Sequence, residues 1–193
     1  MRENGTAHLE EAVVALQETL KEVTRERSPL KWATAENALG AALMFLAMRE
    51  NGTPRVEQAI AAFQEALKEL TRERTPLAWA QTEGNLGGAL MFLGLHDTGT
   101  SRLEGAVSAL SDALKESTRE RNPASWATTE YNHGLCLLCL AQRNKDATMS
   151  EAAVQEVTAA AETMRAIGQA SFAAYFERKL AEARGNCLDV FKQ

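Results

Sequence analysis

Apolar residues recur along this chain at intervals of three and four positions, the spacing that forms one face of an α-helix. The stripe is clearest over about 54–74, where its members are Val56, Ala59, Ile60, Phe63, Ala66, Leu67 and Leu70. The same pattern predicts matching helices over about 7–27 and 101–121, which we call companion helices. With few β-branched runs and abundant Ala, Leu and Glu, the pattern predicts an all-α fold.

A second set of helices is predicted from start signals. Trp32, Trp79 and Trp126 stand at intervals of 47 residues, which indicates a structural repeat. Upstream of each Trp, a residue suited to capping a helix precedes a proline, and proline is favoured at the first helical position. These pairs are Ser28-Pro29, Thr75-Pro76 and Asn122-Pro123. They predict Trp-bearing helices over about 29–48, 76–95 and 123–142.

Further elements repeat in the same phase. An Arg-Glu-Arg triplet occupies 25–27, 72–74 and 119–121, and we expect it in the last turn of each companion helix. Gly-Thr pairs at 5–6, 52–53 and 99–100 are expected to separate helices, with Gly closing one in a left-handed conformation. An eroded companion helix (about 149–166) and a capping helix with charged faces (about 169–187) complete about eight helices.

This arrangement predicts a single solenoid domain. Its parts are a half unit over about 1–28, full units over 29–75, 76–122 and 123–168, and the capping helix. Residues 2–6 match residues 49–53 letter for letter, so the chain begins partway through a repeat, as a piece of a longer array would.

Charge and cysteine content narrow the function classes. The 21 basic and 26 acidic residues leave a net charge of −5 without a basic stripe, which argues against nucleic-acid binding. No apolar run approaches the ~18 residues of a membrane span, and the amino terminus lacks a signal core. The three cysteines, at 136, 139 and 187, predict inert buried thiols rather than a disulfide framework, and hence a cytoplasmic location.

The order of residues within each unit resembles the tetratricopeptide repeat. Asn85-Leu86-Gly87 with Leu90 and Gly94, then Ala106-Val107, Leu110, Ala113-Leu114 and Pro123 carry the resemblance, and a second copy runs from Leu39-Gly40 to Pro76. The period of 47 exceeds the usual 34 of the family through about seven extra loop residues and five in the companion helix. The resemblance implies a right-handed α-solenoid of antiparallel helix pairs whose concave groove binds proteins or peptides.

Aligning Leu39, Leu86 and His133 with the family's buried leucine predicts the residues that line the groove. They are Asn37, Ala38, Ala41, Met44, Gly84, Asn85, Gly88, Met91, Tyr131, Asn132, Leu135 and Leu138, with Arg178 and Lys179 at equivalent places in the last helix. The three regular units contribute no basic residue, which argues against a clamp for a peptide carboxylate. Asn85 and Asn132 either bond a peptide backbone in step or bridge neighbouring helices. Arg178 and Lys179 either favour an acidic ligand end or are exposed charges on a capping helix.

Other chemical candidates have simpler interpretations. His133, Cys136 and Cys139 share a helix face, but Leu86, Ala89 and Phe92 stand one repeat earlier, so we expect core packing and no metal. The tryptophans are expected to pack between units and the triplets to be solvated. No Ser-His-Asp arrangement, phosphate-binding glycine loop or motif-placed carboxylate pair is present, which predicts no enzymatic activity and no cofactor.

The leading hypothesis is therefore a protein-interaction scaffold that holds a peptide or protein segment in its groove. Two alternatives remain open. The first is self-assembly through the first helix, whose apolar stripe lacks a preceding Trp-bearing helix to cover it; the candidate residues are Leu9, Ala12, Val13, Leu16 and Leu20. The second is a regulatory or recruiting part of a larger enzyme.

Overall fold

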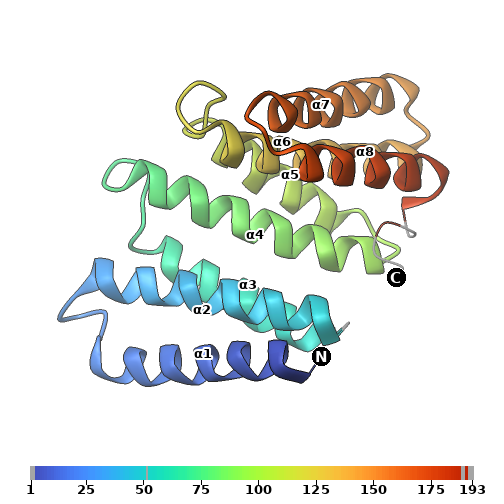
Figure 1. Ribbon diagram of the computed structural model, residues 1–193. Helices are drawn as coiled ribbons and strands as arrows, with labels where there is room; N and C mark the ends of the chain where they lie inside the picture. Colours follow the sequence, from blue (N-terminus) through green and yellow to red (C-terminus); the bar gives the residue numbers. More distant parts are fainter. Residues whose placement is uncertain (1–2, 51, 188–189, 191–193) are drawn as a thin grey trace. The chain divides into compact units, whose positions relative to one another are not determined.

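The computed structural model describes residues 3–50, 52–187 and 190, and within these residues it contains eight helices and no strand (Figure 1). The all-α prediction is therefore confirmed. The helices are α1 (Glu3–Glu22), α2 (Pro29–Glu50), α3 (Thr53–Leu67), α4 (Pro76–His96), α5 (Ser101–Leu114), α6 (Pro123–Asn144), α7 (Ala147–Ala166) and α8 (Ala170–Gly185). None of these helices is long and apolar enough to cross a membrane.

Contacts divide the chain into two compact units, residues 1–89 and 90–193, with the boundary inside α4. In the first unit α1 packs on α2 and α2 packs on α3. In the second unit α5, α6, α7 and α8 pack in sequence order, and α8 also contacts α6. Helices adjacent in the chain are therefore neighbours within each unit, as the repeat predicts.

The Trp-bearing helices begin at the predicted prolines. Each cap residue contributes its backbone carbonyl, which accepts the N–H of the following tryptophan at 2.9, 2.8 and 2.8 Å in α2, α4 and α6. The side chain of Asn122 makes no capping hydrogen bond to α6. The fixed φ of proline, together with these backbone bonds, is what starts the helices.

The companion helices are shorter than predicted, and the Arg-Glu-Arg triplets lie outside them. α3 ends at Leu67, and residues 72–74 form a separate turn before α4. The first arginine of this turn explains the difference, because the Arg72 guanidinium lies over the Trp79 ring, 5.8 Å from its centroid. The same pairing recurs at 5.6 Å for Arg25 over Trp32 and for Arg119 over Trp126. The triplets thus hold the tryptophans by cation–π contact rather than ending a helix.

The Gly-Thr pairs also differ from expectation. Gly52 is extended at φ −106° as the residue before α3, and Gly5 lies inside α1. Among the described residues, positive φ occurs at Gly168 and, without a glycine, at Lys145, which closes α6. The pairs at 52–53 and 99–100 therefore stand at the start of α3 and α5, but the pair at 5–6 lies inside α1, and none of the three ends a preceding helix in a left-handed conformation.

A glycine lets each of the Trp-bearing helices α2 and α6 approach its companion closely. A Cβ placed on Gly40 of α2 would lie 2.5 Å from Phe63 Cε1 of α3, and one on Gly134 of α6 would lie 2.8 Å from Val157 Cγ2 of α7. Phe63 and Val157 are both fully buried. The glycine of the recurring Leu-Gly position therefore decides how tightly a pair packs.

Replacing Gly40 by Ala should destabilise the protein by about 1–3 kcal/mol, because the Phe63 ring has no free space to move into. Gly105→Ala is the matched control, since its Cβ would meet Leu90 Cδ1 at an ordinary 3.6 Å. That substitution should stabilise α5 by about 0.5–1 kcal/mol. Urea denaturation followed by circular dichroism measures both; equal effects of the two variants would contradict the close contact.

The cysteines correct a second prediction. Cys136 is a buried free thiol, as expected, but Cys139 and Cys187 form a disulfide with their Cα atoms 5.5 Å apart. The bridge joins α6 to the segment after α8. Gln142 of α6 donates to Ala183 O of α8 and accepts from Cys187 N of that segment. A separation of 48 residues hides this partner from any local sequence pattern.

Reducing the disulfide should lower the free energy of unfolding by about 2–4 kcal/mol, because an open chain gains conformational freedom when it unfolds. The measurement is urea denaturation with and without reductant, with thiol titration to confirm reduction. The double variant Cys139→Ser/Cys187→Ser serves as the control and should not respond to reductant. An unchanged midpoint for the fully reduced wild-type chain would contradict a stabilising role for the bridge.

Candidate functional site

The first candidate surface lies on α2 and α4 within the first unit. Asn85 Nδ2 donates a hydrogen bond to Asn37 Oδ1 over 3.0 Å, which shows that the two helices are neighbours there. Both asparagines are half-buried, as are the other predicted groove residues of this unit, namely Ala38, Ala41, Met44, Gly84 and Gly88. The structure therefore brings Asn37 and Asn85 together, and Asn85 bridges two neighbouring helices.

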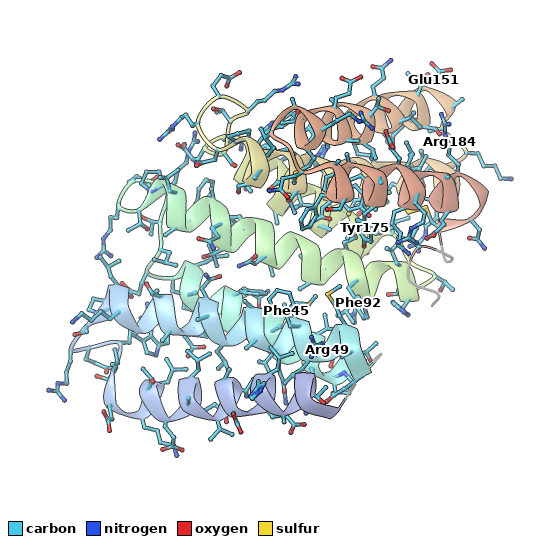
Figure 2. All side chains as sticks on the ribbon, in the orientation of Figure 1. Phe45, Arg49, Phe92, Glu151, Tyr175 and Arg184 are labelled. Atoms are coloured by element: carbon cyan, nitrogen blue, oxygen red, sulfur yellow. A yellow bond between two sulfur atoms is a disulfide. The ribbon has the colours of Figure 1, made fainter. Side chains whose placement is uncertain are left out.

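This surface extends further along α2 than the sequence predicts. Phe45 and Met48 continue the helical spacing of Asn37 and Ala41, and their exposed fractions are 59% and 43%. Figure 2 shows Phe45 on the C-terminal half of α2. We call the nine residues Asn37, Ala38, Ala41, Met44, Phe45, Met48, Gly84, Asn85 and Gly88 the α2/α4 surface. It carries amides and apolar side chains but no charge.

Four of the predicted groove residues, Met91, Tyr131, Leu135 and Leu138, are buried instead. Tyr131 and Leu135 of α6 are 5% and 1% exposed, and Met91 of α4 is 5% exposed. All three belong to the core of the second unit, as does Leu138. Tyr131 is covered by α8, whose Phe176 ring stacks on it with centroids 4.0 Å apart. Burial raises the pKa of the Tyr131 hydroxyl, in keeping with a core position.

The two basic candidates of α8 have different surroundings. Arg178 is exposed and pairs with Glu182 at 2.7 Å. Lys179 is only 8% exposed, and its ammonium donates to Glu182 and to the carbonyl of Val190. Hydrogen bonds from Lys179 and Arg178 lower the pKa of the Glu182 carboxyl. Lys179 therefore holds the C-terminal segment, which leaves Arg178 as the accessible cation of the pair.

A chain of polar side chains, which sequence reasoning missed, crosses three helices of the second unit. Ser111 Oγ of α5 is hydrogen-bonded to His133 Nε2 of α6 at 2.9 Å, and His133 Nδ1 to Glu156 Oε2 of α7 at 2.7 Å. Asn132, beside this histidine, is half-buried. The sequence does carry a signal for this cluster, because the repeat changes at its three positions. The counterparts of Ser111, His133 and Glu156 one period earlier are Gln64, Leu86 and Ala109.

The order of atoms in this chain is that of a serine-histidine-carboxylate triad. Acyl transfer also requires donors aimed at the developing oxyanion. Ser111 lies inside α5, whose backbone N–H groups at that point are bonded within the helix. Helix α5 therefore supplies no oxyanion site. The hydrogen-bonded side chains of Ser111, His133 and Glu156 form a polar link among α5, α6 and α7.

A half-buried glutamate lies beside this link. Burial, followed by the negative charge of Glu156, raises the pKa of the Glu130 carboxyl. Glu36 occupies the same repeat position in α2, and burial together with Glu65 raises its pKa as well. Each carboxylate therefore costs stability while it is ionised in the folded state.

Glu130→Gln should stabilise the protein at pH 7 by less than about 1 kcal/mol, since water screens a half-exposed charge. The raised pKa means that the folded state binds the proton more tightly than the unfolded state. The penalty is therefore present above the folded pKa of Glu130 and disappears as pH falls below the ordinary glutamate value.

Urea denaturation of both proteins from pH 4 to 8 measures this difference. Glu151→Gln, at an exposed position of α7 (Figure 2), is the control and should show no gain at any pH. A Glu130→Gln variant that is less stable than wild type at pH 7 would contradict the interpretation.

The turns before the Trp-bearing helices make packing and ion-pair contacts with neighbouring elements. Trp32 packs against the cluster of Ala33, Ala66 and Leu70, which confirms its predicted packing role. Arg25 also donates to Glu69 at 2.7 Å, and this hydrogen bond is the main cause of the lowered pKa of the Glu69 carboxyl. Arg25 thus joins the turn before α2 to the turn that follows α3.

The self-association candidates lie on α1 and partly contact α2. Val13 is 6% exposed, and Leu9, Leu16 and Leu20 are half-buried. The predicted stripe is therefore not fully open, because α2 covers part of it.

Two further findings concern metal ligands and known proteins. Within the part of the chain that the structure describes, no group of three or more His, Cys, Asp or Glu side chains could hold a metal ion. Comparison of the chain with protein-family models, curated proteins and solved structures finds no match.

Proposed function

We propose that this chain is a protein-interaction scaffold that binds a peptide or protein segment on the α2/α4 surface. The proposal includes a tetratricopeptide-like, right-handed solenoid whose groove contains that surface. The observation that carries it is the coincidence on two neighbouring helices of a bonded asparagine pair and exposed apolar side chains, with no charge among the surface residues.

The chemistry of the surface indicates the type of ligand. An asparagine amide has two N–H donors and an oxygen with two lone pairs, so the Asn37–Asn85 bond leaves Asn37 Nδ2 and Asn85 Oδ1 able to bond a peptide backbone. Gly84 and Gly88 have no side chain to keep that backbone away. Phe45 and Met48 provide apolar contact, and methionine adapts to varied shapes. The ligand we expect is an uncharged, extended segment with one or two large apolar side chains.

We also propose that the chain has no catalytic activity of its own and acts in the cytoplasm. Support for the first point is that α5 places no oxyanion donors next to Ser111. A cytoplasmic location and a persistent Cys139–Cys187 bridge oppose each other, because reducing compartments keep thiols free. The oxidation state of this pair in cells therefore tests the location.

Phe45→Ala/Met48→Ala should weaken binding of the natural partner at least tenfold, because buried aromatic and flexible apolar contacts dominate interface energies. Asn85→Ala should weaken it less, by removing one backbone contact and the bond to Asn37. The partner is first isolated by pull-down with the wild-type chain, and affinities are then measured by calorimetry.

Phe172→Ala is the matched control, since Phe172 is equally exposed, at 54%, but lies on α8. Circular dichroism should show unchanged helicity in all variants. A partner that binds Phe45→Ala/Met48→Ala as tightly as wild type, while Phe172→Ala weakens it, would refute the α2/α4 surface.

A further inference from the structure

The companion helices carry the same apolar face, but it is covered to different degrees. We call this face the inner face. In α3 its residues Ala59, Phe63 and Ala66 are all 0% exposed, and the corresponding residues of α5 are at most 1% exposed: Ala106, Leu110 and Ala113. In α1 the same repeat positions hold Ala12 and Leu16, which are half-buried, and Thr19, which is exposed.

The repeat shows what normally covers an inner face. Phe63 of α3 meets Gly40 of α2, and Val157 of α7 meets Gly134 of α6 at the same repeat position. In both pairs the covering element is the Trp-bearing helix that precedes the companion helix. α1 packs instead on α2, which follows it, and the residue buried by that contact is Val13. The inner face of α1 therefore has no Trp-bearing helix on it among the described residues.

Helix α8 has a different surface at the corresponding positions. Ala181 of α8 stands one period after Gly134, at the glycine position, and it is exposed. Beside it, Glu177 pairs with Arg165 at 2.5 Å and Arg178 pairs with Glu182 at 2.7 Å. Small and charged residues suit an end that meets water, as repeat proteins require of their capping elements. The inner face of α1, by contrast, carries no charged residue and consists of Ala12, Leu16 and Thr19.

We propose that the inner face of α1 docks a Trp-bearing helix of the α2 type, supplied by another polypeptide segment. The occupant is defined by chemistry: an amphipathic helix with glycine at the place of Gly40, so that Leu16 can approach its backbone as Phe63 does in α3. The argument is continuity, because α2–α3 and α6–α7 are two examples of this interface within the same chain.

A folded second copy is a poorer occupant. Its α2 already packs on α3, and its α6 already packs on α7, so neither helix is free to dock without leaving its own companion. Its α8 offers Ala181 where close approach requires glycine. The interaction adds a helix to the α1 side of the first unit, and it does not depend on ligand binding at the α2/α4 surface.

The test uses the full chain and a synthetic peptide with the sequence of residues 28–50, labelled at its amino terminus and followed by fluorescence anisotropy. We expect saturable binding to the wild-type chain and at least a tenfold loss with Leu16→Glu. Thr19→Ala should strengthen binding several-fold, because alanine occupies that position in the covered helices α3 and α5. This gain separates docking from a general loss of folding.

Two controls sharpen the result. Val14→Glu, at a position that is 56% exposed, should leave the affinity unchanged. A peptide with Gly40→Leu should bind at least tenfold more weakly, because its side chain prevents the close approach. The peptide could instead displace α2 of the protein itself, and that binding would not depend on Leu16. Equal binding to the wild-type chain and to Leu16→Glu would therefore overturn the proposal.

Failure of the peptide to bind at 100 µM would also overturn it. So would sedimentation of the wild-type chain as a dimer that Leu16→Glu dissociates, because the occupant would then be a second copy.

Discussion

The close contact between a Trp-bearing helix and its companion is the interaction on which the rest of this structure depends. Gly40 against Phe63, and Gly134 against Val157, bring two helix backbones near enough for the companion's inner face to be fully buried. A repeat that buries this face needs one helix of each type, and neither can bury its apolar surface alone. The position of the glycine in the repeat therefore explains both why pairs form and why α1, with no such helix on its inner face, presents a docking surface.

The turn before each Trp-bearing helix adds a second contact, which recurs at all three tryptophans. An arginine lies over the tryptophan that begins each Trp-bearing helix, and in the first unit the same arginine reaches Glu69 of the next turn. The first arginine of each triplet therefore has a structural contact, with a tryptophan ring at the start of the next helix. The α2/α4 surface, by contrast, contains no charged residue.

The second unit departs from the regular repeat in several ways. α8 packs its Phe176 on Tyr131, which converts predicted groove positions into core. Polar residues replace apolar ones at Ser111, His133 and Glu156, and a disulfide ties the final segment to α6. These features occur together in the second unit, where they add contacts among α5, α6, α7 and α8.

The sequence by itself determined the helix types, their starts at the three prolines and the pairing of neighbouring helices, because these depend on local spacing and on a repeated pattern. It also identified Asn37 and Asn85, which the repeat places at neighbouring positions. Only the tertiary structure decided that Tyr131 is buried, that Cys139 finds Cys187, and that Ser111, His133 and Glu156 meet. Each of these depends on residues from different helices approaching in space, and a pattern read along one chain carries no information about that approach.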